Sequence, residues 1–162
     1  MDAQAIKRHA WRIASQAMVA KGNRVEAYST GQIRFFFEQA RSSGFETSIS
    51  NKIEGYRPQP PDGRSGNIGQ VSEEMKKLTD INSSVGSQVI SVMKMLEPEE
   101  RIRFAQYLLW NVKIIEQMSG DPERIRTILR AEKIDEPDEI LNQLKKISEL
   151  NSQNQKKGQR RR

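Results

Sequence analysis

Cysteine is absent from this sequence of 162 residues, and histidine occurs once, as His9. A chain without cysteine forms no disulfide bond and offers neither a thiolate metal ligand nor a cysteine nucleophile. A single histidine completes neither a catalytic triad nor a metal site. Because His9 stands in a basic stretch, we interpret it as a solvated surface residue.

The acidic residues and glycines give no sign of an active site either. Acidic pairs such as Glu99-Glu100 stand at expected helix starts, where negative charge complements the helix dipole. The glycines between residues 55 and 70 lack the flanking strand and helix of a phosphate-binding loop. We therefore predict a protein that is not an enzyme, with no catalytic residues, no metal site and no cofactor.

Long apolar runs are also missing. No stretch approaches the about 18 apolar residues of a membrane-spanning helix, and the first residues lack the apolar segment of a secretory signal. Apolar residues make up 35% of the chain and aromatic residues 6%. This composition favours a water-exposed or partner-dependent protein that contacts no membrane, and we expect it in the cytoplasm.

Positive charge is concentrated towards the two ends of the chain. The formal net charge is +6, from 27 basic and 21 acidic residues. Residues 1–57 carry nine basic and five acidic side chains, whereas residues 58–150 carry thirteen basic and sixteen acidic ones. Residues 151–162 add five basic side chains and no acidic one. A polyanionic partner would therefore meet the ends of the chain.

Apolar residues recur at helical spacing through most of the chain, and no convincing strand alternation occurs. We therefore predict an all-α fold, a small bundle of six or seven helices. The expected parts are a basic helical part over 1–54, a flexible Pro/Gly-rich linker or loop over 55–70, a helical bundle over 71–150 and a disordered basic tail over 151–162. Residues 55–70 contain three prolines and four glycines, which cannot extend a helix.

Capping and breaking residues set the expected helix boundaries. Gly44 is expected to end the second helix, and Ser72 to cap the helix that follows the loop. Residues 45–54 are ambiguous, with a short helix possible, and the polar residues from Asn82 to Gly86 are expected to divide the helix that contains them. Pro98 and Pro122 are typical first residues of helices, and a further helix should follow Pro137.

The helix after Pro98 is the most apolar and is expected to be the central core helix. Its main stripe and the residues that widen it are Ile102, Ala105, Leu108, Leu109, Val112 and Ile115, with Phe104, Trp110 and Ile114. Three adjacent aromatic residues, Phe35 to Phe37, cannot all face one side of a helix, because each step turns it by about 100°. We expect two of them in the core and Phe35 against a protein neighbour.

Basic side chains on the first two expected helices are the candidate binding residues. The first helix offers Lys7, Arg8 and Arg12, and the second offers Arg34 and Arg41. Together they could follow a phosphate backbone, since a guanidinium forms paired hydrogen bonds with phosphate oxygens. The alternative is that they are ordinary solvated faces.

The second helix carries a resemblance to a known family. Tyr28-Ser29-Thr30-Gly31-Gln32-Ile33-Arg34, running into Phe35-Phe36-Phe37-Glu38-Gln39, resembles a signature of the small helical subunit of type III (Csm, type III-A-like) CRISPR–Cas effector complexes. In that family a capping threonine precedes a buried aliphatic residue and an arginine, here Thr30, Ile33 and Arg34. A later core helix of the family is similar at Phe104, Tyr107, Val112 and Ile115. The resemblance covers about residues 5–44 and 85–118.

The resemblance implies a structural role in antiviral defence. Such subunits are not nucleases; they stack in several copies, contact the backbone of the guide RNA–target RNA duplex without reading its sequence, and touch the other protein subunits of the complex. Thr30 would cap its helix, Ile33 would pack, and Arg34 would touch RNA. The Pro/Gly-rich residues 55–70 replace a basic helix end of the family, and the helices after Asp121 and the basic tail look like additions.

Two other functions fit the sequence. One is a small helical DNA-binding regulator of phage or plasmid origin, although the second helix is too aromatic for a recognition helix that reads bases. The other is a protein–protein adaptor with no role in nucleic-acid binding. Sequence-preferring binding to double-stranded DNA would favour the first, and insensitivity to loss of Arg34 and Arg41 would favour the second.

Overall fold

The computed structural model describes residues 1–19, 30–56, 68–118, 121–134, 138–146 and 149. Six helices are α1 (Ala3–Val19), α2 (Thr30–Gln39), α3 (Phe45–Glu54), α4 (Ile68–Lys94), α5 (Pro98–Gln117) and α6 (Pro122–Ala131). A seventh helical segment covers 138–146, and none of the described residues lies in a strand. The predicted all-α bundle is confirmed. The predicted tail and most of the predicted loop lie outside the described residues.

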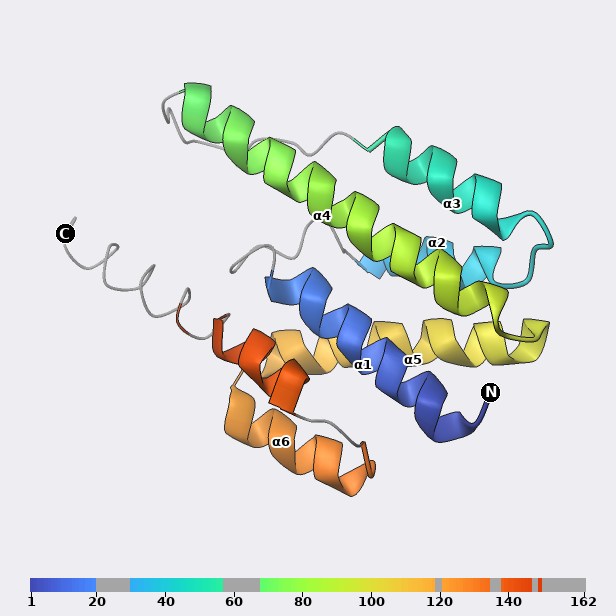
Figure 1. Ribbon diagram of the computed structural model, residues 1–162, viewed down its shortest axis with the longest axis vertical. Helices are drawn as coiled ribbons and strands as arrows, with labels where there is room; N and C mark the ends of the chain where they lie inside the picture. Colours follow the sequence, from blue (N-terminus) through green and yellow to red (C-terminus); the bar gives the residue numbers. More distant parts are fainter. Residues whose placement is uncertain (20–29, 57–67, 119–120, 135–137, 147–148, 150–162) are drawn as a thin grey trace.

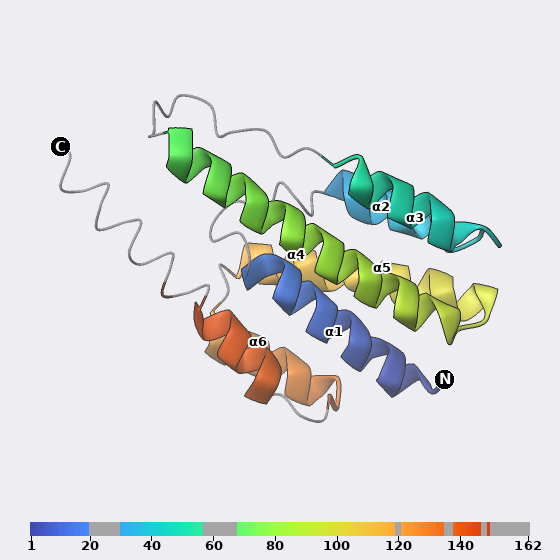
Figure 2. The ribbon, with the colours of Figure 1, turned by 45° about the horizontal axis from the view of Figure 1, so that its top comes forward.

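Helix α5 is the main packing partner of α1 and α2. Both α1 and α2 pack against α5, while α4 contacts α1 on one side and α3 on the other (Figures 1 and 2). Helices α1 and α4 lie side by side and run in opposite directions. Buried apolar side chains from α1 to α6 and from 138–146 form one core, so the helices on either side of the Pro/Gly-rich segment belong to the same packed body.

Helix α4 departs from the predicted boundaries. It begins at Ile68, four residues before the expected cap Ser72, and it continues without a break to Lys94. The break predicted between Asn82 and Gly86 is wrong because both residues lie on the buried face of the helix. A Cβ atom at Gly86 would meet Cδ1 of Ile53 and come within 2.9 Å of its Cγ1, so this glycine lets α3 lie close against α4.

The segment between α2 and α3 also differs from expectation. Helix α2 ends at Gln39, and Gly44 stands directly before α3 instead of ending α2. The ambiguous stretch 45–54 is the helix α3, and its buried residues Phe45, Ile49 and Ile53 recur every fourth position. Arg101 of α5 holds this corner, since its guanidinium donates to the Ser42 carbonyl at 3.2 Å and lies 5.0 Å from the Phe45 ring centre.

The burial of several aromatic residues differs from the prediction. Trp110 was expected to widen the core, but its side chain is 65% exposed. Phe36 is buried as expected, whereas Phe35 and Phe37 are both half-buried against the core edge. Lys52 of α3 lies 4.5 Å from the Phe35 ring centre, so this ring has a partner within the chain.

Polar contacts attach the C-terminal helices to α1. Trp11 is fully buried and donates through Nε1 to Oε2 of Glu132 at 2.9 Å. Ser15, also buried, donates through Oγ to Oε1 of Gln143 at 2.6 Å. These hydrogen bonds fix the segment after α6 to the first helix of the chain.

Candidate nucleic-acid interface

Near the start of α2, a buried residue is followed directly by an exposed one, within the segment that resembles the family signature. Ile33 is fully buried, and the next residue, Arg34, is exposed. Consecutive residues point about 100° apart around a helix, so packing of Ile33 and Phe36 against the core directs Arg34 to solvent. The helix begins at Thr30, the residue expected near its start.

Arg41 does not continue the Arg34 face of α2. It was expected on the same helix as Arg34, but α2 ends at Gln39 and Arg41 lies in the turn that follows. Its guanidinium carbon lies 5.6 Å from the ring centre of Phe37, and the residue is exposed. Arg34 and Arg41 are therefore both accessible to an anion, with the position of Arg41 set by the turn.

The three basic residues of α1 are half-buried, and Lys7 and Arg12 contact other elements. Nε of Arg12 lies 3.2 Å from Oε2 of Glu139, which belongs to the helical segment 138–146. Nζ of Lys7 lies 5.5 Å from the ring centre of Tyr107 on α5. Arg12 thus contributes to holding the C-terminal segment, and Lys7 lies at the edge of α5. Arg8 lies beside Lys7 in the sequence.

The five predicted residues are divided between α1 and the α2 region. Helices α1 and α2 each make their main contacts with α5, while their second main contacts are with α4 and α3 respectively. In Figure 2 α4 passes between α1 and the pair α2–α3, and in Figure 1 α2 lies behind α4. The basic residues of α1 and those of α2 therefore belong to two regions joined through α5.

His9 is half-buried, in contrast to the solvated position expected from its basic neighbours. Burial lowers the pKa of its imidazole below the ordinary value of 6.5, and the nearby positive charges of Arg12 and Arg8 lower it further. The imidazole is therefore neutral at pH 7 and adds no positive charge to α1.

Trp110 is a candidate functional residue that the sequence analysis placed in the core. It stands two positions from Leu108 and from Val112, both buried, so it points to the opposite side of α5. This spacing was available in the sequence and could have identified Trp110 as exposed. The residues three, four and seven positions from it are Arg103, Gln106, Tyr107, Lys113, Ile114 and Gln117, and none is acidic.

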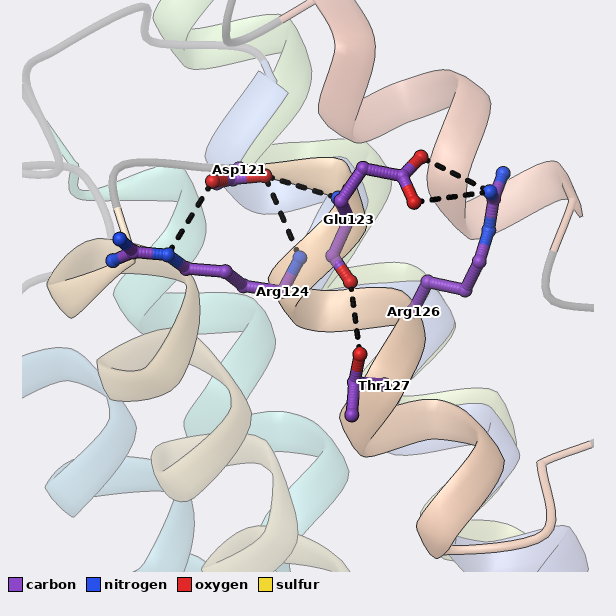
Figure 3. A network of polar contacts seen from close by, with 5 residues as sticks. All are labelled: Asp121, Glu123, Arg124, Arg126 and Thr127. Atoms are coloured by element: carbon purple, nitrogen blue, oxygen red, sulfur yellow. Dashed lines mark hydrogen bonds and ion pairs between the residues drawn. The ribbon is translucent and has the colours of Figure 1, made fainter.

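Basic residues near the start of α6, by contrast, have acidic partners on the same helix (Figure 3). Nε of Arg124 lies 3.5 Å from Oδ2 of Asp121, and Nη1 of Arg126 lies 3.0 Å from Oε1 of Glu123. Asp121 also accepts hydrogen bonds from the backbone N–H groups of Glu123 and Arg124, which caps the helix. This end of α6 is electrically balanced and is a poor site for an anion.

Comparison with protein-family models, curated proteins and solved structures gives no match. Within the described residues, no group of three or more histidine, cysteine, aspartate or glutamate side chains is arranged to hold a metal ion. None of the helices there combines the length and apolar character needed to cross a membrane.

Proposed function

We propose that this chain is a non-catalytic small subunit of a type III CRISPR–Cas RNA-guided effector complex. In this role several copies stack together, contact the other protein subunits and touch the backbone of the guide RNA–target RNA duplex without sequence specificity. The complex would act in antiviral defence in the cytoplasm. The chemistry of RNA cleavage would belong to other subunits.

One observation carries the proposal: the buried Ile33 followed by the exposed Arg34 at the start of α2, within the segment that resembles the family signature. That arrangement matches the packing and RNA-contacting roles that the resemblance implies. Arg41, exposed in the turn after α2, adds a second exposed cation beyond the end of this helix. Contacts of arginine with phosphate and sugar oxygens bind every sequence similarly, which fits recognition of a duplex by its backbone.

Affinity purification of the tagged protein from its native host, in mild salt, tests the proposal directly. RNA sequencing and mass spectrometry should find short guide-like RNAs together with several larger protein subunits. Recovery of the protein alone, or with fragments of double-stranded DNA, would contradict the proposal and leave the adaptor or the DNA-binding regulator.

The contribution of the α2 region is tested with purified protein and two RNA duplexes of unrelated sequence. The double variant Arg34→Ala/Arg41→Ala should bind both duplexes more weakly by a similar factor, roughly tenfold. Its Kd should also depend less on salt, because two phosphate contacts are lost. The matched control is the double variant Arg130→Ala/Lys145→Ala, which also removes two positive charges, from exposed positions outside α2. A loss confined to one sequence, or an equal loss in the control, would contradict backbone contact through α2.

A further inference from the structure

The outward face of α5 has an exposed aromatic ring that the fold does not use. Trp110 lies on the side of the helix opposite the buried residues Phe104, Leu108 and Ile115. Leaving 65% of this side chain in water forgoes much of the stabilisation that its burial would give. The other tryptophan, Trp11, is fully buried and hydrogen-bonded, so the two have different roles.

Basic side chains flank Trp110 in both directions along α5. Arg103 and Lys113 are exposed and lie within about 60° of Trp110 around the helix. A rise of about 1.5 Å per residue sets them about 10 Å before and about 5 Å after the tryptophan along the axis. Lys7 of α1 extends the positive charge, because its ammonium group lies over the ring of Tyr107 beside this face.

Acidic groups on α5 lie further from the ring. Glu116 is six positions beyond Trp110 and about 120° around the helix, and Glu99 is eleven positions before it. Glu100 is ten positions before Trp110 and interacts electrostatically with Arg103. The ring therefore has cations on both sides and no carboxylate among its nearest neighbours on the helix. This charge arrangement is complementary to an anionic chain.

The surroundings of Trp110 favour a nucleic-acid strand over a protein surface. A stable protein interface usually buries about 800 Å² on each partner around an apolar centre. In the described part of the chain the other exposed large apolar residues are Met1 and Met95, which lie outside α5. The exposed neighbours of Trp110 on the helix are Arg103, Gln106, Lys113 and Gln117, and the apolar neighbours Tyr107 and Ile114 are half-buried. This mixed, mainly polar surface suits a flat base stacking on one ring with phosphates beside it.

We propose that the outward face of α5 binds single-stranded nucleic acid, with Trp110 stacking on an unpaired base and with Arg103 and Lys113 contacting phosphates on either side. The inference rests on the proposed function only for the expectation that RNA is the strand encountered. It adds a second surface, distinct from α2, that recognises unpaired nucleotides rather than a duplex.

The test uses the purified full-length chain and a fluorescein-labelled oligouridine RNA without secondary structure, measured by anisotropy. Trp110→Ala should raise Kd by about 5- to 100-fold, the usual loss when an aromatic platform for one base is removed. Trp110→Phe, which keeps an aromatic face, should stay within about threefold of the unaltered protein. Trp110→Leu, which keeps apolar area without a ring, should behave like Trp110→Ala.

Two further measurements separate stacking from other causes. Binding should quench tryptophan emission in the unaltered protein and leave the emission of Trp110→Ala unchanged, because the buried Trp11 is then the remaining emitter. The double variant Arg103→Gln/Lys113→Gln should lower the slope of log Kd against log salt concentration by about 1.4, since each phosphate contact to a single strand contributes about 0.7. Met95→Ala, a change at another exposed apolar residue, is the matched control and should have no effect.

The inference is overturned if the unaltered protein does not bind the oligonucleotide, if Trp110→Ala binds it equally well, or if Trp110→Leu binds it as well as Trp110→Phe. Loss of a co-purifying protein in Trp110→Ala, with oligonucleotide binding intact, would assign the face to protein docking instead. These outcomes are independent of the proposed function, because the effector-complex assay uses the native host and the duplex assay uses Arg34 and Arg41.

Discussion

Burial of His9 on α1 keeps its imidazole neutral at a pH where a solvated histidine is partly protonated. The main cause is loss of water around the ring, and the positive charges of Arg12 and Arg8 act in the same direction. At the residue scale, a side chain in a basic stretch thus takes its properties from the packing of its helix. The same holds for Trp110, whose side of α5 decides that it is exposed.

The lowered pKa of His9 gives a stability that depends on pH. As the pH falls past about 6.5, His9 binds its proton in the unfolded chain before it does so in the folded chain, so the free energy of unfolding should fall over this pH range. His9→Gln should reduce this fall between about pH 7.5 and about pH 5.5, measured by urea midpoints. An unchanged pH dependence in this variant would contradict the buried, neutral imidazole.

Titration of Glu100 does not contribute to the change in stability between about pH 7.5 and about pH 5.5. Its pKa is lowered from the ordinary 4.5, chiefly by a hydrogen bond from the amino group of Met1 and then by one from the backbone N–H of Glu97. Stability linked to this carboxylate is complete above about pH 4.5 and is lost below it. The two groups can therefore be followed separately.

Gly86 gives a second prediction at the residue scale. Gly86→Ala should destabilise the fold by about 1 kcal/mol, because the new methyl group meets Ile53 and overpacking outweighs the gain in helix propensity. In an Ile53→Ala background the same change should become stabilising by up to about 1 kcal/mol, as the obstruction is gone. Urea unfolding of the four proteins measures both values.

The control for this cycle is Gly44→Ala. A Cβ atom there would lie 3.8 Å from Oγ of Ser42, an ordinary contact, so no dependence on Ile53 is expected. If the effect of Gly86→Ala has the same sign in both backgrounds, the close approach of α3 and α4 is not what requires glycine at this position.

At the scale of one element, α6 begins with a compact polar arrangement that compensates for its few buried residues. Asp121 accepts from two backbone N–H groups, Pro122 occupies the first turn, and Thr127 donates to the Glu123 carbonyl at 3.2 Å (Figure 3). Ile125 and Leu129 are the apolar residues of this helix that are fully buried. The start of α6 therefore depends strongly on its cap.

Asp121→Ala should destabilise α6 by about 1 kcal/mol, since two N–H groups at the helix start lose their acceptor. Asp121→Asn retains an oxygen at the cap and should cost much less. Hydrogen exchange of the α6 amides, together with urea unfolding, measures the effect. Equal exchange rates in Asp121→Ala and the unaltered chain would show that packing alone holds the helix start.

At the scale of the whole molecule, periodicity predicted the all-α fold because apolar stripes such as Ala105, Leu108 and Val112 report burial directly. Prediction from periodicity failed where contacts between residues far apart in the sequence determine where a helix begins or whether it continues. Gly86 weakens an isolated helix, but in α4 it makes room for Ile53 of α3. Ser72 has the chemistry of a helix cap, yet α4 already begins at Ile68. For the candidate site, the exposure of Arg34 followed from its neighbour Ile33, whereas the ion pair of Arg12 with Glu139 required the tertiary fold.

The hydrogen bonds from α1 to the C-terminal helices also bear on folding during synthesis. Trp11 and Glu132 are 121 positions apart, and Ser15 and Gln143 are 128 apart. A nascent chain holds α1 outside the ribosome long before these acceptors have been translated. The Ser15 hydroxyl has a nearby acceptor in the Arg12 carbonyl of the same helix, at 2.9 Å. The indole N–H of Trp11 must instead remain hydrated until Glu132 has been made, so closure of this part of the core belongs to the last stage of folding.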